Sequence, residues 1–416
     1  MKKSKSNTFC PAPFTQLNFK NDNRIMPCCK IASMSPDSKV TARSIDEYWD
    51  SDELKNLRKN LFNDVKDPIC SKCWDEETYR AGNTSLRKQQ LARLGEKRIN
   101  DLYETASRQL ESNTVSKTLI KEIEMRFDNI CNLQCRMCHP HFSHKWEADA
   151  RTNPELSKLF ATIPAPSSKN GIMSDETIQE IIQLVPNLEK IIISGGEAMY
   201  SRRHYEFLDQ IKEDASHLTL FYPTNLTLLE YKSWKVVDLW KNFKKISIRV
   251  SIDGCTQDRY GYIRQGGILA DVEKNIRELK THKNIVVTSA ITVSILNITQ
   301  LTEIMEYLVS LGTTPQNVLV QYPVDLNIQV LPQGLKNEIT QKWDDYLSGK
   351  DKDSPGYHNL IKQGQSIINY MNINDMSHKW NDAKEFCAIQ DRHFNTNILD
   401  VIPEFTPYWQ QNVKDD

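Results

Sequence analysis

Three cysteines lie close together in the stretch CNLQCRMC, which covers residues 131–138. Their spacing, CxxxCxxC, lets one short loop present three thiolates: Cys131, Cys135 and Cys138. Four thiolates fill a 4Fe–4S cluster, so a loop that supplies three would leave one iron open to a small molecule. A structural zinc site is the alternative, although zinc loops favour paired CxxC knuckles and a fourth ligand. His139, directly after Cys138, is the nearest candidate for that ligand.

A second group of five cysteines precedes residue 74. Its members lie in the stretches TFCPAPF, MPCCK and ICSKCW: Cys10, Cys28, Cys29, Cys70 and Cys73. The proline of MPCCK and the CxxC of ICSKCW favour two turns that present thiolates to one ion or cluster. Because this region contains little apolar sequence, we expect metal ligation to supply much of its stability. Four thiolates suit a zinc ribbon as well as an iron–sulfur cluster.

The elements that position the first cysteine loop begin near residue 118. From there the sequence alternates strand and helix patterns, which is typical of a parallel α/β sheet. The first strand ends at Asp128 and leads into the loop. Five further strands are expected at residues 190–194, 218–222, 246–252, 285–293 and 317–322. The run KIIIS at 190–194 is of the type that is buried on both faces of a sheet.

Polar residues and glycines cluster where these strands end. In α/β barrels the functional site lies at the carboxyl ends of the strands, so we expect these residues to gather near the cysteine loop. A glycine pair also lets the backbone approach a ligand closely. Strand-end capping is the alternative for Asn225 and Ser251, and a surface position is the alternative for Arg264. The candidates are Gly195, Gly196, Glu197, Asn225, Ser251, Asp253 and Arg264.

These motifs resemble those of radical S-adenosylmethionine (SAM) enzymes, with CxxxCxxC after the first strand and GGE after the second. The resemblance implies an α/β fold, a partial (β/α)6 TIM-like barrel over residues 118–325. It also implies that Cys131, Cys135 and Cys138 hold a 4Fe–4S cluster whose open iron chelates SAM. Reductive cleavage of SAM then gives a 5′-deoxyadenosyl radical, which takes hydrogen from a substrate.

The resemblance also implies roles for the residues at the strand ends. Gly195, Gly196 and Glu197 match the family's GGE, whose backbone carbonyl or carboxylate accepts from the SAM amino group. Asn225, Ser251 and Asp253 stand where the family contacts the SAM carboxylate or ribose. Arg264 would pair the methionyl carboxylate through two hydrogen bonds.

Residues 1–75 resemble the twitch or SPASM auxiliary-cluster domains of these enzymes, although such domains usually follow the barrel. The resemblance implies that a second iron–sulfur cluster is held by four of the five cysteines: Cys10, Cys28, Cys70 and Cys73. Whether Cys28 or Cys29 is the ligand stays open. With four cysteine ligands the second cluster has no open iron, so it would exchange electrons with a substrate radical. A zinc ribbon remains the alternative.

Three other regions complete the predicted organisation. A helix is expected over Ile45–Leu61, a helical connector over residues 76–117 and a helical C-terminal extension over residues 326–416. The basic stretch Arg87–Arg98 is interpreted as a solvated helix face, with a binding patch as the alternative. The tail from Phe386 is expected to lie across the open side or mouth of the barrel.

The composition restricts the classes of partner. The 416 residues include 53 Lys and Arg and 54 Asp and Glu, so the net charge is −1. Nothing in this balance draws the whole protein to nucleic acid or to anionic membranes. No run is long enough to span a bilayer, and the start MKKSKS is not followed by an apolar signal region. A cytoplasmic location is therefore expected, where ten cysteines indicate metal or redox sites rather than disulfides.

The predicted substrate follows from the resemblance alone. Enzymes that look like this, with such auxiliary domains, often modify peptides or proteins, and a small metabolite is the second choice. They also need a reducing partner such as flavodoxin or ferredoxin. A non-catalytic zinc-binding adaptor protein is the alternative from another class, and the metal that the protein binds would distinguish the two.

Overall fold

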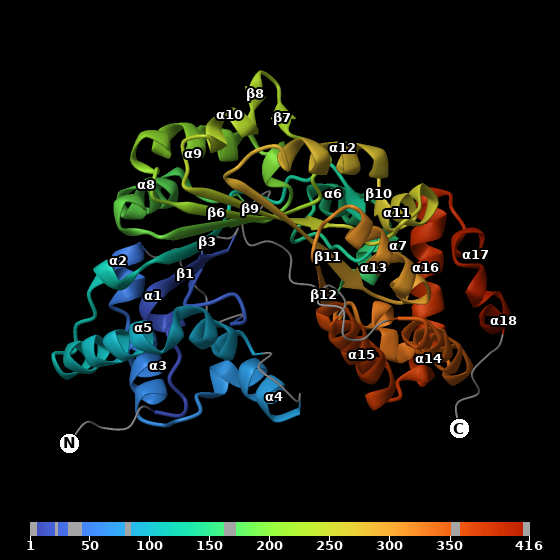
Figure 1. Ribbon diagram of the computed structural model, residues 1–416, viewed down its shortest axis with the longest axis horizontal. Coiled ribbons are helices and arrows are strands. Elements are labelled where there is room, and N and C mark those ends of the chain that lie inside the picture. Colours follow the sequence, from blue (N-terminus) through green and yellow to red (C-terminus); the bar gives the residue numbers. More distant parts are fainter. Residues whose placement is uncertain are drawn as a thin grey trace.

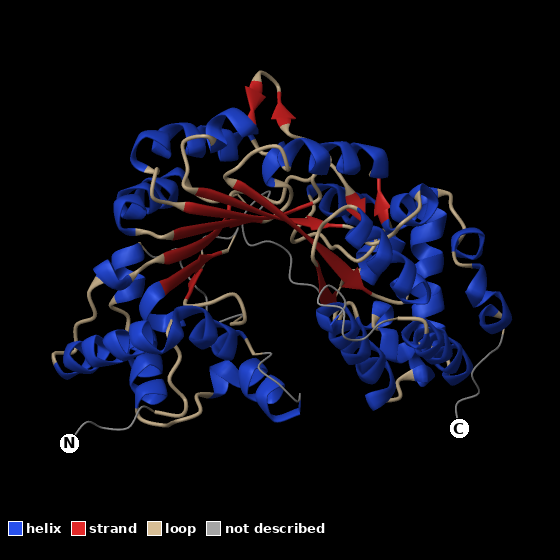
Figure 2. Ribbon diagram, viewed as in Figure 1, coloured by secondary structure: helices blue, strands red, loops and turns tan. Residues whose placement is uncertain are grey.

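The computed structural model describes residues 6–20, 24–31, 44–79, 85–161, 172–350 and 358–410. Its centre is an eight-stranded sheet with the order β12-β11-β9-β6-β5-β3-β1-β2 (Figure 2). All neighbouring strands are parallel except β1 and β2. The strands are β1 (Gln16–Phe19), β2 (Ile25–Met26), β3 (Glu122–Arg126), β5 (Lys190–Ser194), β6 (Thr219–Thr224), β9 (Lys245–Ser251), β11 (Ile285–Val293) and β12 (Pro315–Leu319).

The six strands from β3 to β12 confirm the predicted α/β fold. They pair in chain order, as in a partial barrel in which each strand is followed by a crossover to the next. The bounds of β5 and β11 coincide with the predicted ranges, and the other strands differ by a few residues.

Helices cover one face of this sheet (Figure 1). One of them, α8, begins where the hydroxyl of Ser174 accepts from the backbone N–H of Thr177, and it buries Ile178 and Ile181. The strand residues on this face are also buried, so sheet and helices share one core. The helices on this face are α8 (Asp175–Leu184), α9 (Arg202–Ile211), α10 (Val236–Trp240) and α12 (Leu269–Leu279), and α13 (Leu301–Ser310) precedes β12.

The opposite, inner face of the sheet is polar and only partly buried. In β5, Ile191 and Ile193 are fully buried, whereas Lys190, Ile192 and Ser194 are half-buried. The prediction that residues 190–194 are buried on both faces is therefore wrong. The physical reason is that the inner face lines a cavity instead of a second packed layer.

The cysteine-rich N-terminal residues continue the central sheet. β1 lies beside β3, with Asn18 opposite Glu124, and β2 forms the edge of the sheet. The predicted helix over Ile45–Leu61 is two helices, because Asp50 ends the first and the side chain of Ser51 caps the second. The helices here are α1 (Ala12–Thr15), α2 (Ile45–Trp49), α3 (Asp52–Phe62), α4 (Ser71–Tyr79) and α5 (Leu86–Glu111).

The basic stretch Arg87–Arg98 lies in α5 and faces other parts of the protein. Arg87 is buried and pairs with Glu77 of α4, Arg93 pairs with Glu122 of β3, and Arg98 pairs with Glu189 just before β5. The interpretation of this stretch as a solvated face is therefore wrong for Arg87, whereas Arg93, Lys97 and Arg98 are exposed as expected. Charge alone could not reveal that α5 lies along the inner edge of the sheet, where acidic residues face it.

The C-terminal region is helical, as predicted. α14 and α15 lie beneath the β11–β12 end of the sheet, and the N-terminal helices lie beneath its β1–β3 end (Figure 1). α16 reaches the cysteine loop, because Arg136 pairs with Asp391 at 3.0 Å and Gln390 Nε2 donates to the Arg136 carbonyl. The helices are α14 (Gln333–Ser348), α15 (His358–Ile373), α16 (Trp380–Phe394), α17 (Ile398–Val401) and α18 (Thr406–Trp409).

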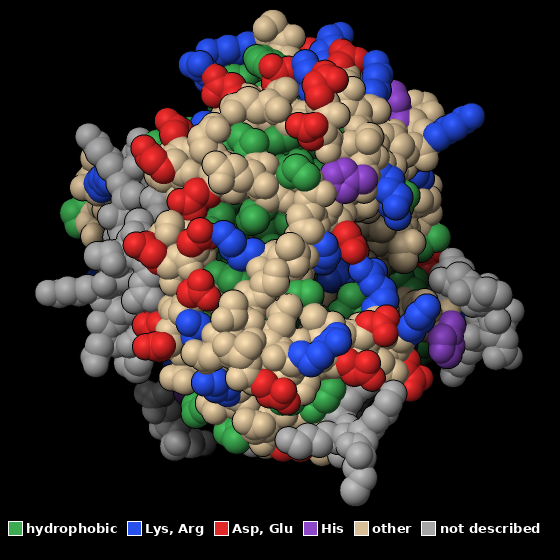
Figure 3. Space-filling view, turned by 90° about the vertical axis from the view of Figure 1, so that its left-hand side faces the viewer, with side chains coloured by type: hydrophobic (Ala, Val, Ile, Leu, Met, Phe, Trp, Pro, Cys, Tyr) green, Lys and Arg blue, Asp and Glu red, His purple; other side chains and the backbone are tan. Residues whose placement is uncertain are grey.

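The surface carries acidic and basic side chains side by side on the face drawn in Figure 3. In the described ranges, no helix has the length and apolar character that a membrane crossing requires. The basic start of the chain, residues 1–5, lies outside the described residues, as do parts of the predicted N-terminal domain, connector and C-terminal extension.

Candidate active site

The cysteine loop connects β3 to α6 (His144–Thr152) and is held at several points. Within the loop, β4 (Gln134–Cys135) pairs with β10 (Arg264–Gln265), which places Arg264 opposite Cys135. The backbone N–H of Cys131 donates to Nδ1 of His144 at 3.1 Å. The indole N–H of Trp146 donates to the carbonyl of Cys135 at 2.9 Å. The backbone of the loop is thus fixed independently of any ligand.

The three thiols of this loop are close to one another and away from bulk water. Burial, together with the charge of Cys135, raises the pKa of Cys138 to about 12. Burial also raises the pKa of Cys131 well above its ordinary value, with further contributions from Cys135 and Glu197. The guanidinium of Arg264 opposes this effect at Cys135, since its Nη1 donates to Sγ at 3.8 Å. One loop therefore carries three sulfur donors, with the guanidinium of Arg264 beside Cys135.

The glycine pair after β5 packs directly against the start of the cysteine loop. A Cβ on Gly196 would lie 2.1 Å from the carbonyl oxygen of Ile130, so no other residue fits there without movement. Gly195 has a φ of +123°, a conformation that L side chains rarely adopt. The N–H of Glu197 then donates to the carbonyl of Ile130 at 2.8 Å. The GGE motif thus joins β5 to the loop through its backbone.

The carboxylate of Glu197 is buried and already accepts three hydrogen bonds. Oε1 accepts from Thr224 Oγ1 at 2.7 Å and from the N–H of Met199 at 3.2 Å. Oε2 accepts from the N–H of Asn225 at 2.8 Å. Burial raises its pKa, and these donors lower it. The carboxylate therefore links β5 to the end of β6. Since it already has three donors, the backbone of the GGE motif is better placed than this carboxylate to accept a hydrogen bond from a ligand.

Asn225 connects the end of β6 to the cysteine loop. Its Nδ2 donates to Oδ1 of Asn132 at 3.0 Å, and its Oδ1 accepts from the N–H and hydroxyl of Thr227. Asn132 Nδ2 in turn donates to the hydroxyl of Thr227 at 2.7 Å. Asn132 and Thr227 were not predicted as site residues. The feature of the sequence that could have identified Asn132 as a site residue is its position directly after Cys131.

Asp253 and Arg264 form an ion pair beside the cysteines. Their closest atoms, Oδ2 and Nη2, are 2.7 Å apart, and both side chains are buried. Asp253 Oδ1 also accepts from the N–H of Thr292 at 2.6 Å. The alternative that Arg264 is a surface residue is therefore wrong. Ser251 ends β9 two residues earlier, and within the described ranges its hydroxyl has no hydrogen-bond partner.

The N-terminal cysteines line a separate pocket. Four of the five share it: Cys10, Cys28, Cys70 and Cys73. Burial raises the pKa of Cys10 well above its ordinary value, and the charges of the other three raise it further. Cys29 instead lines the cavity on the inner face of the sheet. Taken over the described residues, no three His, Cys, Asp or Glu side chains converge as the ligands of a single metal ion.

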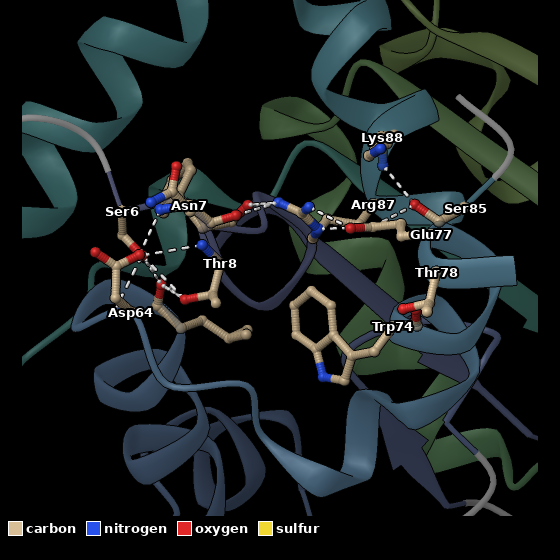
Figure 4. Close-up of polar contacts among 12 residues, drawn as sticks. Ser6, Asn7, Thr8, Asp64, Trp74, Glu77, Thr78, Ser85, Arg87 and Lys88 are labelled. Atoms are coloured by element: carbon tan, nitrogen blue, oxygen red, sulfur yellow. Dashed lines mark hydrogen bonds and ion pairs between the residues drawn. The ribbon is translucent and has the colours of Figure 1, made fainter. Parts of the chain in front are cut away.

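Arg87 holds together the segments that carry two of these cysteines (Figure 4). It donates to both carboxylate oxygens of Glu77, from Nε at 2.9 Å and Nη2 at 2.6 Å. Its Nη1 also donates to the carbonyls of Asn7 and Phe9, directly before Cys10. The guanidinium lies 5.2 Å from the ring of Trp74, the residue after Cys73. The buried guanidinium of Arg87 therefore holds Phe9 and Trp74, the neighbours of Cys10 and Cys73, in position at the wall of the pocket.

The remaining cysteines lie elsewhere. Cys387 is buried in α16, and Cys255 is half-buried against the core after β9. Neither lines the N-terminal pocket or the inner cavity. Their surroundings are those of cysteines that pack as small apolar residues.

Comparison with known proteins places the central part of the chain in a family. The model of the radical SAM superfamily matches residues 125–308. A protein of Methanocaldococcus jannaschii named "Probable GTP 3′,8-cyclase" is 27% identical over 238 residues, which cover 55% of this chain and 69% of that protein.

Two solved structures are also similar to this chain. The structure described as native anSMEcpe with bound AdoMet shares 18% identity, with 55% of this chain and 62% of that chain covered and a TM-score of 0.37. Streptococcus suis SuiB bound to precursor peptide SuiA shares 13% identity, with 71% and 59% covered and a TM-score of 0.38. The chain thus spans about three fifths of the length of these structures. The match therefore places residues 125–308 in the radical SAM superfamily and indicates that the chain is an enzyme.

Proposed function

We propose that this enzyme cleaves SAM reductively and uses the resulting radical to abstract hydrogen from a substrate. The observation that carries this proposal is that one loop carries three desolvated thiols and is held against the GGE backbone and the Asp253–Arg264 pair. Superfamily membership implies a 4Fe–4S cluster and SAM, and the donor set suits that group. Three thiols from one loop leave one iron for a small molecule, and Gly196 lets the backbone approach closely.

In this proposal Cys131, Cys135 and Cys138 would hold the cluster. The cluster would supply the electron that splits the sulfonium of SAM into methionine and the 5′-deoxyadenosyl radical. The backbone of Gly195 and Gly196 would accept from the SAM amino group, because the Glu197 carboxylate already has three protein donors.

Two further groups would orient SAM. Arg264 is held by Asp253, so its guanidinium has a fixed position from which to meet the methionyl carboxylate. Ser251 and Asn225 would contact the ribose or carboxylate. Ser251 has a free hydroxyl among the described contacts, while Asn225 has most of its amide engaged.

We also propose a second iron–sulfur centre on Cys10, Cys28, Cys70 and Cys73. The pocket that these four side chains share supports this set and favours Cys28 over Cys29. The centre would exchange electrons with the substrate radical, and a structural zinc ion is the alternative.

The domain boundaries are likewise a proposal: an auxiliary domain at 1–75, a connector at 76–117, the barrel at 118–325 and an extension at 326–416. The auxiliary domain would then share the sheet of the barrel through β1. A peptide or protein is the proposed substrate, with a small metabolite as the alternative, and flavodoxin or ferredoxin would be the reducing partner. A non-catalytic zinc adaptor is the alternative from another class.

The test is anaerobic reconstitution followed by SAM cleavage. Roughly eight iron and eight sulfide per chain are expected for two 4Fe–4S clusters, and roughly four iron with one zinc for a structural ribbon. Cys135→Ala should abolish 5′-deoxyadenosine formation under reductant, whereas Cys387→Ala should retain it. Zinc without iron in the wild type, or continued cleavage by Cys135→Ala, would falsify the proposal.

A further inference from the structure

The inner face of the sheet carries a cavity of about 410 Å³, a size that suits a ligand. It lies between the strands and the N-terminal helix α5, and Cys28 and Cys29 form part of its wall. The strands supply alternate residues to it, because successive side chains point to opposite faces. Its polar and charged lining residues are Gln16, Asn18, Gln89, Gln90, Arg93, Glu122, Glu124, Lys190 and Arg249.

Most of the charges in this cavity are already paired. Glu122 contacts Arg93, accepts from Gln16 Nε2 at 3.1 Å, and lies 3.5 Å from Lys190. Glu124 accepts from Arg126 Nη2 at 3.0 Å and from the hydroxyl of Ser194 at 3.0 Å. These two carboxylates therefore have protein partners and leave no negative charge for a further cation.

Arg249 is the exception. Within the part of the chain that the structure describes, its guanidinium has no ion pair or hydrogen bond, and its Nε is buried without a partner. Its closest aromatic neighbour is Phe221, with Cζ 4.8 Å from the ring centre, and Lys190 Nζ lies 5.1 Å from the same ring. Burial lowers the pKa of Arg249. Arg249 is half-buried, and a partly desolvated cation without a counter-charge suits an anionic ligand.

Asn18 is a second unpaired group in the same lining. This residue is 2% exposed, and among the residues that the structure describes neither its Oδ1 nor its Nδ2 has a hydrogen-bond partner. A buried carboxamide normally satisfies both its donor and its acceptor. A ligand that complements it must offer an acceptor and a donor together, as a peptide bond does.

The positions of these two residues set the length of the ligand. Asn18 is on β1 and Arg249 is on β9, with β3, β5 and β6 between them. Four strand spacings correspond to roughly 19 Å along the sheet. An extended peptide advances about 3.3–3.6 Å per residue, so a ligand that reaches both groups contains several residues.

We propose that this cavity binds a peptide substrate, with an acidic side chain on Arg249 and a backbone amide on Asn18. The inference rests on the proposed radical SAM function and specifies its substrate class. One unpaired guanidinium matches one carboxylate, whereas a nucleoside triphosphate carries several negative charges and would also face Glu122 and Glu124. Arg249 lies two residues before Ser251 on the same face of β9, so the bound peptide extends toward the proposed SAM site.

The test uses the reconstituted full-length enzyme and pools of N-acetylated, C-amidated hexapeptides. Each pool fixes Asp or Glu at one position, and a matched pool fixes Asn or Gln there. Binding is measured by anaerobic equilibrium dialysis. The best acidic pool should bind roughly tenfold more tightly than its amide partner, as expected for a charge-assisted hydrogen bond. Arg249→Gln should remove this preference, and Arg249→Lys should restore part of it.

Two further variants separate specific from general effects. Asn18→Leu should weaken the acidic and amide pools equally, because it removes a contact to the backbone. Lys245→Gln, at the exposed start of the same strand, should bind and cleave like the wild type. An acidic preference that survives Arg249→Gln, an absence of binding to every acidic pool, or displacement of the best acidic pool by GTP would each overturn the inference. SAM cleavage without peptide is measured separately, so failure of the proposed function is recognised independently.

Discussion

At the residue scale, the contact between Arg264 and Cys135 links the ion-pair network to a proposed cluster ligand. Arg264 donates to Sγ at 3.8 Å while Asp253 holds it from the other side. Donors to cluster sulfurs and nearby positive charge favour the reduced, more negative state of an iron–sulfur cluster. Burial of Asp253 and Arg264 together keeps this donor in place without a bound ligand.

We therefore predict that Arg264→Gln lowers the midpoint potential of the SAM-binding cluster. The expected shift is on the order of tens of millivolts, since 59 mV corresponds to a tenfold change for a one-electron couple. The measurement is a redox titration followed by electron paramagnetic resonance. Arg277→Gln, an exposed position on α12, is the control and should not shift the potential. An unchanged potential in Arg264→Gln would show that the contact has no electrostatic influence on the cluster.

Gly196 gives a second prediction at this scale. Gly196→Ala places a Cβ 2.1 Å from the Ile130 carbonyl, so the GGE turn and the cysteine loop must separate. Overpacking of this kind destabilises by about 1–3 kcal/mol, and we expect the iron content to fall as well. Gly349→Ala is the matched control, because the nearest atom to its Cβ is 3.9 Å away. Chemical unfolding and iron analysis of both variants are the measurements, and equal stability would contradict the packing argument.

At the scale of elements, the strand pattern was predictable and the use of the inner face was not. The sequence KISIRVS of β9 alternates buried Ile246, Ile248 and Val250 with more exposed residues on the other face. That alternation signals a strand with one open face, unlike the strands of a sheet covered on both sides. From the sequence we predict burial on both faces only for residues 190–194 and do not use the alternation in β9, so Arg249 is not identified as a residue of the inner face.

The N-terminal elements were harder to predict for a different reason. β1 has only four residues and joins β3 across more than 100 positions in sequence, so no local pattern shows the pairing. Likewise the contact of α16 with the cysteine loop depends on Arg136 and Asp391, which are 255 residues apart. Motifs within one loop could be predicted, whereas partners brought by distant elements could not.

The contact between α16 and the cysteine loop leads to a prediction about stability. Arg136 is 1% exposed, and Asp391 is its ion-pair partner. Asp391→Asn leaves the guanidinium buried without a counter-charge, so we expect a loss of about 3 kcal/mol in the free energy of unfolding. Hydrogen exchange of the amides at 131–138 should accelerate as well. Asp400→Asn, at an exposed position on α17, is the control. Unchanged exchange at the loop would mean that α16 does not stabilise it.

At the scale of the whole molecule, the inner cavity adjoins the pocket of the N-terminal cysteines. Cys28 lines both the N-terminal pocket and the cavity, so the proposed second centre adjoins the proposed peptide site. The GGE backbone and the cysteine loop lie beyond the carboxyl ends of the strands that line the same cavity. In this proposal a substrate radical in the cavity would lie between two sites. The cysteine loop at 131–138 would generate the radical, and the N-terminal cysteines would hold the centre that exchanges an electron with it. It also makes Cys29, which lines the cavity but not the N-terminal pocket, the natural control.

We therefore predict different effects on the iron content when Cys73 and Cys29 are each replaced by alanine. Cys73→Ala should lose about half of the iron if both centres are 4Fe–4S clusters, and should still cleave SAM in the absence of peptide. Cys29→Ala should keep the full iron content, because its side chain does not line the pocket that the other four share. Iron, sulfide and zinc analysis with deoxyadenosine quantification checks both. Loss of zinc alone from Cys73→Ala would show that the N-terminal site is a structural zinc ribbon. Loss of iron from Cys29→Ala would show that Cys29, instead of Cys28, is the fourth ligand. Unchanged metal in Cys73→Ala would remove Cys73 from the metal site and leave the cavity with one redox centre.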